Sequence, residues 1–316
     1  MTDKIRLGIS SCLLGRKVRY DGGHKLDHYL VDTLGPFVDY VPVCPEVEAG
    51  FPVPREAFRL VGDPTAPRLV TQKTRQEHTE RMQQWAQRKL EELEQAELCG
   101  FIFKSQSPSS GMERVKVYNE RGVAEKKGVG IFARAFQERF PLLPVEEEGR
   151  LQDVNLRENF IVRIFTAKRW QEMVFAGESV KGLVDFHSRH KLLVMAHHPE
   201  RLRQLGKIVA DPRQRPLLQV RENYFRLLLQ ALSFRATVKK NVNVLQHMAG
   251  YFKKQLSVDE KRELQDMIKD YYSSLVPLIV PLTLIKHYVR KYGQQYLAGQ
   301  VYLNPHPLEL KLRNHA

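Results

Sequence analysis

Two thiols and a carboxylate follow short apolar runs near the start of the chain. Cys12 comes directly after R-L-G-I-S (6–10), Cys44 comes directly after D-Y-V-P-V (39–43), and Glu46 stands two residues further on. If the two runs are parallel neighbouring strands, both thiols reach the same edge of one sheet. A Cys-Pro step such as that at Cys44 often accompanies iron–sulfur ligation, and a carboxylate beside thiols suits a general base or proton shuttle.

Spacing alone leaves a simpler interpretation open. The three cysteines, Cys12, Cys44 and Cys99, form no C-x-x-C pair, so each is equally consistent with a buried and inert side chain. Glu46 is equally consistent with a solvated loop position. Three separated cysteines in a chain that opens on M-T-D-K-I-R, without an apolar leader, argue against disulfides and favour a cytoplasmic location.

A serine-rich loop follows the apolar run G-F-I-F (100–103). It reads K-S-Q-S-P-S-S-G (104–111), in which Ser107, Ser109 and Ser110 supply hydroxyl groups and Gly111 permits close backbone approach. The alternative role of these hydroxyls is a turn that closes the loop on itself. The loop is the third one expected at the same sheet edge.

The elements that must position these residues change in character near residue 150. Strand patterns at 6–10, 39–43, 100–104 and 143–147 alternate with helical patterns at 24–34, 74–98 and 129–140. This alternation predicts an α/β domain over 1–150 with a mostly parallel, Rossmann-like sheet. Apolar spacing of three and four residues at 155–175, 178–196, 217–234, 236–256 and 258–275 predicts an all-α domain over 151–316.

Charge is divided unequally between the two predicted domains. The whole chain has 50 basic and 36 acidic residues; residues 1–150 hold 23 and 22 of them, and the remainder hold 27 and 14. A domain with a net charge of +13 is expected to meet a polyanion such as RNA. The longest apolar run, 275–285, is interrupted by Pro277 and Pro281, so no membrane span is expected, and no obligatory protein partner is evident.

Three blocks of this sequence resemble the signature blocks of the thiouracil desulfidase family. They are S-C-L-L-G-R-K-V-R-Y-D-G (11–22), V-C-P-E-V-E-A-G-F-P-V-P-R (43–55) and the serine-rich loop. The C-terminal half, with G-L-V-D-F-H-S-R-H-K (182–191) and V-N-V-L-Q-H-M-A-G-Y-F (242–252), resembles the helical domain often fused to that family. The two-domain arrangement is similar to that of bacterial tRNA 4-thiouridine desulfidases.

The resemblance implies an enzyme that converts 4-thiouridine in tRNA to uridine and releases sulfide, by hydrolysis of a C–S bond without redox change. It implies a [4Fe-4S] cluster held by three cysteines, with thiolated tRNA as the partner. By position, Cys12 and Cys44 match two of the cluster ligands, Glu46 matches the acid/base and Ser107 its hydroxyl partner.

The third ligand is where this chain departs from the resemblance. Many relatives have cysteine at the position of Ser110, and the remaining cysteine, Cys99, precedes a five-residue strand that spans on the order of 16 Å. Three outcomes are open. The fold brings Cys99 to the cluster, which completes the ligand set Cys12, Cys44 and Cys99; Ser110 supplies an oxygen ligand, or the third iron is held in another way; or the cluster is absent.

Further loop residues are predicted to hold the substrate's phosphate or uracil edges. An equal alternative for the charged ones is loop scaffolding by salt bridges. Two other functions stay open: a desulfidase of free thiouracil or thionucleosides, and a non-catalytic RNA-binding protein that lacks the cluster. The predicted substrate-binding residues are Arg19, Asp21, Arg55, Lys104, Ser109 and Ser110.

Overall fold

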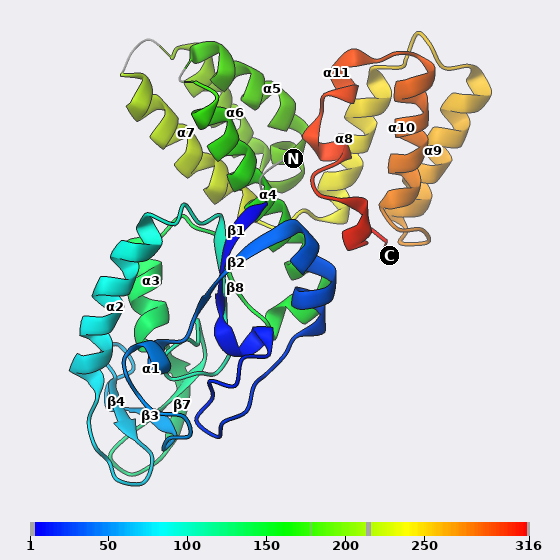
Figure 1. Ribbon diagram of the computed structural model, residues 1–316. Helices are drawn as coiled ribbons and strands as arrows, with labels where there is room; N and C mark the ends of the chain where they lie inside the picture. The colour runs from blue at the N-terminus through cyan, green and yellow to red at the C-terminus, as the bar shows by residue number, and fades with distance from the viewer. Residues whose placement is uncertain (1–3, 178, 213–215, 315–316) are drawn as a thin grey trace. The chain divides into compact units, whose positions relative to one another are not determined.

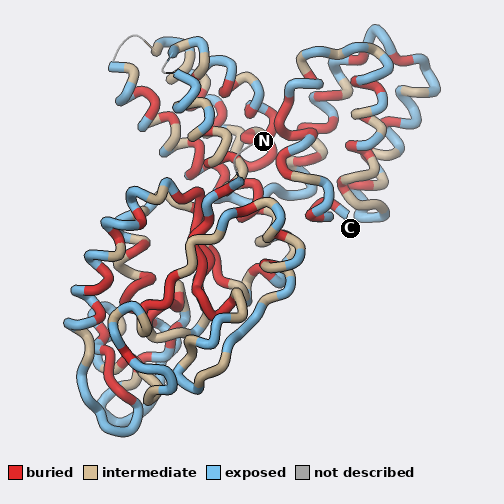
Figure 2. Tube along the Cα trace, viewed as in Figure 1, coloured by how far each residue is buried: buried red, intermediate tan, exposed pale blue. Residues whose placement is uncertain are grey.

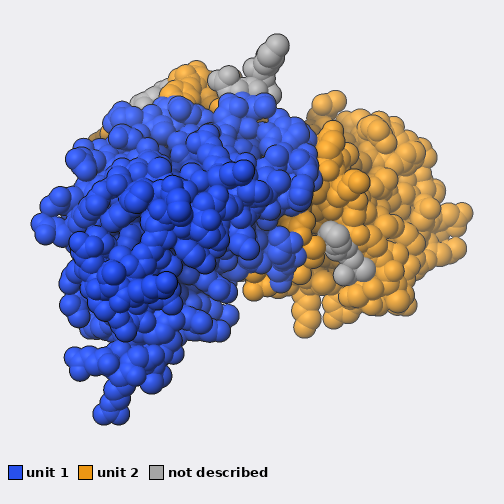
Figure 3. All heavy atoms as spheres, turned by 60° about the horizontal axis from the view of Figure 1, so that its bottom comes forward, with its two compact units in different colours: residues 1–153 blue, residues 154–316 orange. Residues whose placement is uncertain are grey.

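The computed structural model describes residues 4–177, 179–212 and 216–314. The chain divides into two compact units, Met1–Asp153 and Val154–Ala316, which Figure 3 shows in separate colours. Each unit has its own hydrophobic core. The sequence prediction placed the division after residue 150, and the structure places it after Asp153.

A four-stranded parallel sheet forms the centre of unit 1. Its strand order is β2-β1-β5-β8, and all three pairings are parallel. Ser10 at the end of β1 lies opposite Val43 at the end of β2, so the loops that follow both strands leave from the same edge. The predicted α/β class is therefore confirmed. The strands are β1 Ile5–Ser10, β2 Val38–Val43, β5 Gly100–Phe103 and β8 Val145–Glu147.

Two helices, α2 (Thr79–Glu94) and α3 (Ile131–Arg139), lie side by side in unit 1 (Figure 1). Aromatic rings join them to the sheet: Phe101 on β5 packs against Phe132 and Phe136 of α3, with centroids 5.9 and 4.8 Å apart. Trp85 of α2 packs on Phe132 at 5.2 Å. These buried rings anchor the loop after β5 and the loop before α3. Figure 2 shows the strands of the parallel sheet as buried and exposed residues along α2.

A second, mixed sheet in unit 1 was only partly predicted. Its order is β4-β3-β6-β7, with a parallel pairing between β3 and β6 and antiparallel pairings at both edges. Of its four strands, only β6 coincides with an alternating stretch of the sequence, M-E-R-V-K-V-Y (112–118). The strands are β3 Phe58–Val61, β4 Arg68–Thr71, β6 Val115–Tyr118 and β7 Ala124–Gly128.

Two helices of unit 1 are shorter than their sequence pattern. The segment expected to be helical over 24–34 is a π-helical turn at Tyr29–Leu34 followed by a 3₁₀ turn at Gly35–Phe37. The helix expected over 74–98 spans only Thr79–Glu94, because Glu77 pairs with Val70 of β4 and Arg75 has a positive φ of 60°. A left-handed residue cannot continue a helix.

Unit 2 is all α-helical, as predicted. Helices α6, α10 and α11 were not expected from the sequence. Pro281 was read as an interruption, but it lies in the first turn of α10, where a missing N–H breaks no helical hydrogen bond. No helix within the described residues has the length and apolar character to cross a membrane. The helices are α4 Val154–Phe175, α5 Val180–His197, α6 Pro199–Ala210, α7 Leu217–Leu232, α8 Val238–Gly250, α9 Val258–Tyr272, α10 Ile279–Lys291 and α11 Gln295–Ala298.

Candidate functional site

The three loops that leave the parallel sheet enclose a cavity of about 570 Å³. The loop after β1 contributes Cys12, the loop after β2 contributes Cys44 and Glu46, and the loop after β5 contributes Ser107 and Ser110. The structure thus brings together residues that are up to 98 positions apart in the chain. The predicted convergence at one sheet edge is what the parallel pairing produces.

Short helical turns aim the two thiols. Cys12 lies in the 3₁₀ turn Ser11–Leu14, which Gly15 ends in a left-handed conformation with φ 82°. Cys44 is the residue before α1 (Pro45–Glu48), and its backbone N–H donates to Oε1 of Glu48 at 2.7 Å. Both side chains are only 8% exposed.

Both thiols are protonated in the absence of a bound cation. Burial raises the pKa of Cys12 to about 11 and that of Cys44 to about 12; Lys104 opposes the shift at Cys12, whereas Glu46 adds to it at Cys44. A metal that binds here must displace both protons, and its charge is what stabilises the thiolates.

Glu46 is held between the serine-rich loop and the thiol of Cys44. Ser109 Oγ donates to Glu46 Oε1 at 2.5 Å, whereas Oε2 accepts from Cys44 Sγ at 3.6 Å and lies 3.7 Å from Nη2 of Arg55. Ser107 does not contact Glu46; its Oγ lies 2.9 Å from Oγ of Ser109. Ser109, which the sequence placed with the substrate-binding residues, is thus the direct hydroxyl partner of the carboxylate.

The serine-rich loop is fixed by the start of α3. The carbonyl of Pro108 accepts from the N–H of Ile131 at 3.1 Å, and that of Ser109 accepts from the N–H of Phe132 at 2.9 Å. These are donors that a helix cannot satisfy internally. Gly111 allows the tight packing, because a Cβ there would lie 2.4 Å from a methyl carbon of Val115.

Inside the loop, Ser107 also makes the turn that the alternative reading expected. Its Oγ accepts from the backbone N–H of Ser109 at 3.3 Å and from that of Ser110 at 3.1 Å. Ser110 is 3% exposed and lines the cavity. A hydroxyl therefore stands in the cavity wall at the position where the family resemblance expects a third thiol.

Cys99 does not join the other two cysteines. It lies before β5, where its N–H donates to the carbonyl of Arg6 at 2.8 Å, and Cys12 lies beyond the other end of β1. Arg6 and Ser10 of β1 are about 13 Å apart at strand rise. The structure therefore does not bring Cys99, which was predicted to complete the ligand set, to Cys12 and Cys44, since a regular strand carries its two ends to opposite edges. Within the described ranges, no three His, Cys, Asp or Glu side chains are grouped as metal ligands.

Three of the four charged residues predicted to bind substrate line the cavity: Arg19, Arg55 and Lys104. Asp21 does not; it accepts from the N–H of Gly23 at 3.0 Å and lies 3.6 Å from Arg19. The scaffolding alternative is also visible, because Arg55 donates to the carbonyl of Val18 at 3.1 Å.

Sequence reasoning missed two residues that hold Lys104. Its Nζ lies 2.5 Å from Oε1 of Glu148, and its backbone N–H donates to Oγ of Ser10 at 2.9 Å. The run of three glutamates at 146–148, at the end of a predicted strand, was the signal available for Glu148. These contacts tie the serine-rich loop to β8 and β1.

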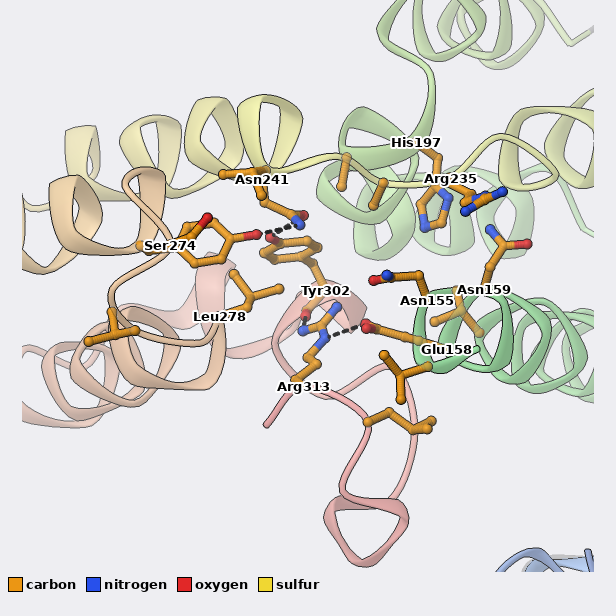
Figure 4. Close-up of a pocket in the computed structure, with 18 residues that line it drawn as sticks. Asn155, Glu158, Asn159, His197, Arg235, Asn241, Ser274, Leu278, Tyr302 and Arg313 are labelled. Carbon is orange, nitrogen blue, oxygen red and sulfur yellow. Dashed lines mark hydrogen bonds and ion pairs between the residues drawn. The ribbon is translucent and has the colours of Figure 1, made fainter. Parts of the chain in front are cut away.

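Unit 2 has a cavity of its own, about 290 Å³, drawn in Figure 4. Many of its polar groups satisfy one another: Asn241 donates to Tyr271 Oη at 3.0 Å, Tyr302 Oη donates to Asn241 Oδ1 at 2.9 Å, and Arg313 Nε lies 2.9 Å from Glu158. These bonds join α8 to α9 and α4 to the C-terminal segment. They are consistent with a structural role.

The α/β unit gathers two thiols, a carboxylate and serine hydroxyls around one cavity, and comparison with known proteins relates this unit to desulfurases. Residues 7–148 match the model of the 2-thiouracil desulfurase family, and residues 191–307 match a family described as a protein of unknown function, DUF1722. The chain is 34% identical over 158 residues to the uncharacterized protein YbgA of Escherichia coli strain K12. The aligned region covers 50% of this chain and 94% of YbgA. The chain belongs to the family of YbgA, and its residues 7–148 match the 2-thiouracil desulfurase family.

A solved structure, that of the [4Fe-4S]-dependent thiouracil desulfidase TudS, is 29% identical to this chain. The match has a TM-score of 0.40 and covers 48% of this chain and 95% of TudS.

Proposed function

We propose that the protein is an iron–sulfur-dependent desulfidase that converts 4-thiouridine in tRNA to uridine and releases sulfide. The observation that carries the proposal is the position of Glu46, which contacts Ser109 on one side and the Cys44 thiol on the other inside one cavity. The match of this unit to the 2-thiouracil desulfurase family supports the reaction class.

The cofactor that the resemblance implies is a [4Fe-4S] cluster, and the donor set suits it in a modified form. Cys12 and Cys44 offer two thiols on adjacent loops, and Ser110 offers a hydroxyl in the same cavity wall. Iron accepts thiolate sulfur and also oxygen ligands. Cys12, Cys44 and Ser110 are therefore the residues that would hold the cluster.

A cluster held by these residues would supply an iron that accepts the soft thiocarbonyl sulfur and lowers the electron density at the C–S carbon. Glu46 would take the two protons of the attacking water in turn and pass both to the departing sulfur. Ser109 fixes the carboxylate through its 2.5 Å hydrogen bond. One water is consumed, one hydrogen sulfide is released, and a C=O bond replaces C=S without oxidation or reduction.

The charge of the C-terminal half favours tRNA over a free thiobase as the substrate. After residue 150 the chain has 27 basic and 14 acidic residues, and a positively charged domain binds nucleic acid phosphates. A free thiobase would need only the cavity. The two substrate classes, tRNA and a free thiobase or thionucleoside, are distinguished by measuring kcat/KM of the full chain for thiolated tRNA, 4-thiouridine and thiouracil. A higher kcat/KM for tRNA that falls with added salt supports the proposal; equal values for the three would assign the activity to the free base.

The decisive test uses anaerobically iron-loaded protein and thiolated tRNA, with the thiouridine absorbance followed over time. Loss of absorbance with stoichiometric release of sulfide is expected. Unchanged absorbance in a preparation that contains iron and labile sulfide would overturn the tRNA assignment. A preparation that binds tRNA but takes up no iron would instead support the alternative of a non-catalytic RNA-binding protein.

A further inference from the structure

A basic groove of about 610 Å³ adjoins the desulfidase cavity in unit 1. Phe58, Ser105, Gln106 and Pro108 line both hollows, so they share one wall. Beyond this wall the groove runs over β3, β6 and β7 of the mixed sheet, and Figure 1 shows β3 and β7 near one another. The groove is therefore the immediate neighbour of the cavity in which a base would bind.

Five cations line the groove; Arg150 is paired with Glu113 and Glu146, and the other four have no ion pair within the part of the chain that the structure describes. They are Arg59, Arg114, Lys116 and Lys126. The acidic residues in the same wall are engaged elsewhere: Glu113 pairs with Arg150 at 2.7 Å, and Glu147 accepts from the N–H of Met112 at 2.6 Å. The groove therefore carries uncompensated positive charge.

Two of these cations face each other across a strand pair. Lys116 of β6 lies directly opposite Lys126 of β7, and both are exposed. Like charges at directly opposed positions destabilise a sheet. An anion between the two ammonium groups turns this repulsion into attraction.

Arg59 supplies an independent observation. Its guanidinium lies over the ring of Tyr118, 5.0 Å from the centroid, and its Nε and Nη2 are shielded from solvent without an acceptor among the described residues. A shielded donor without a partner costs free energy that a hydrogen-bond acceptor would recover. Guanidinium groups of this kind suit phosphate oxygens.

We propose that this groove binds the phosphates of the RNA strand next to the thiolated base, an inference that rests on the proposed desulfidase function of the neighbouring cavity. The cations are spread over three neighbouring strands, roughly 10 Å, which is wider than one phosphate group. Successive phosphates of a single strand fit this spread, and Tyr118 offers a ring to an unstacked base. Unit 1 thereby contributes its own contacts to the polynucleotide.

The test measures equilibrium binding of a short fluorescent oligouridylate to the full chain at several salt concentrations. The double variant Lys116→Gln/Lys126→Gln is expected to weaken binding about tenfold at low salt and to reduce the salt slope by about 1.4, the value for two lost contacts to a single strand. Lys127→Gln is the matched control, because Lys127 neighbours Lys126 but pairs with Glu125 at 2.8 Å and does not line the groove.

An unchanged slope in the double variant, or an equal loss in the Lys127 control, would overturn the proposal. Uridine monophosphate serves as a competitor: displacement of the oligouridylate at equal concentrations would assign the groove to a single phosphate and also overturn it. Because binding is measured without turnover, these outcomes are distinct from failure of the desulfidase reaction, which the tRNA assay detects on the unmodified protein.

Discussion

Ser109 donates a 2.5 Å hydrogen bond to Glu46 across 63 positions of sequence. It joins the loop after β5 to the loop after β2 and fixes the orientation of the carboxylate in the cavity. The Oγ of Ser107 lies 2.9 Å from the Oγ of Ser109, and Ser107 itself makes no hydrogen bond to Glu46 among the described residues. Ser109, and not Ser107, is therefore the hydroxyl that would orient Glu46 in the proposed proton transfer.

Replacing Glu46 with glutamine should lower kcat by about 10² to 10⁴-fold, the usual contribution of a general acid/base. The amide keeps the size of the side chain and its hydrogen bond with Ser109 but cannot take a proton. Iron content and thiouridine turnover are measured on the same anaerobic preparation. Turnover within a few-fold of the unmodified protein, at equal iron content, would remove Glu46 from the reaction.

Ser109→Ala should lower kcat more than Ser107→Ala does. The first change removes the only hydroxyl that touches Glu46 among the described residues, whereas the second removes its neighbour and the turn bonds to the N–H groups of Ser109 and Ser110. We expect a loss of about tenfold or more for Ser109→Ala, in the range seen when a group that orients an active side chain is removed. The reverse order of effects would restore Ser107 to the role that the sequence suggested.

Iron and labile sulfide per chain should respond to Ser110 and not to Cys99. Cys99→Ala is expected to leave both unchanged, because Cys99 lies at the far end of β5. Ser110→Cys should increase cluster retention under air, since a third thiolate replaces an oxygen donor for iron. Cys12→Ala and Cys44→Ala should each abolish iron binding. Loss of iron in Cys99→Ala, with an unchanged melting temperature, would contradict the ligand assignment.

Unit 2 should lose stability in mild acid. Burial lowers the pKa of four histidines there: His187, His197 and His306 to about 4, and His190 to about 3. Each stays neutral when folded but binds a proton near pH 6.5 when unfolded. Its contribution is therefore complete above pH 6.5 and is lost as the pH falls toward 4, at up to about 1.4 kcal/mol per pH unit for each histidine.

The two tryptophans allow this loss to be assigned. Trp85 lies in unit 1 and Trp170 in the core of unit 2, so urea unfolding of Trp85→Phe reports on unit 2 alone. The urea midpoint should decrease as the pH is lowered from 7 to 5. His187→Gln should reduce the pH dependence of the unfolding free energy by the equivalent of about one proton. The Trp170→Phe variant, which reports on unit 1, should show a weaker dependence. Equal slopes for both reporters would contradict the histidine explanation.

The parallel sheet could be predicted from the sequence because its strands are buried. Ile5–Ser10 and Gly100–Phe103 are nearly continuous apolar runs, the pattern of strands covered on both faces. The mixed sheet lacked that signal: Ala124–Gly128 reads A-E-K-K-G and is exposed over its first four residues. Its pairing depends on partners that are distant in the chain, which a local pattern does not contain.

The site was predictable in its position but not in its contacts. Strand order and parallel pairing were enough to bring Cys12, Cys44 and Glu46 to one edge. The choice of Ser109 over Ser107 depends on how the loop turns, and the turn depends on α3 donating to Pro108 and Ser109. Such tertiary hydrogen bonds have no counterpart in residue spacing.

The register of β1 and β2 has a consequence for how this domain tolerates change. Because Ser10 is aligned with Val43, the separation of Cys12 and Cys44 is set by the ladder of backbone hydrogen bonds and not by the intervening chain. Insertions or deletions in the exposed part of that connection would leave the donor spacing intact. The connection is thus free to diversify and to adapt the rim of the cavity to different substrates, whereas a one-residue slip between the two strands would misplace a thiol.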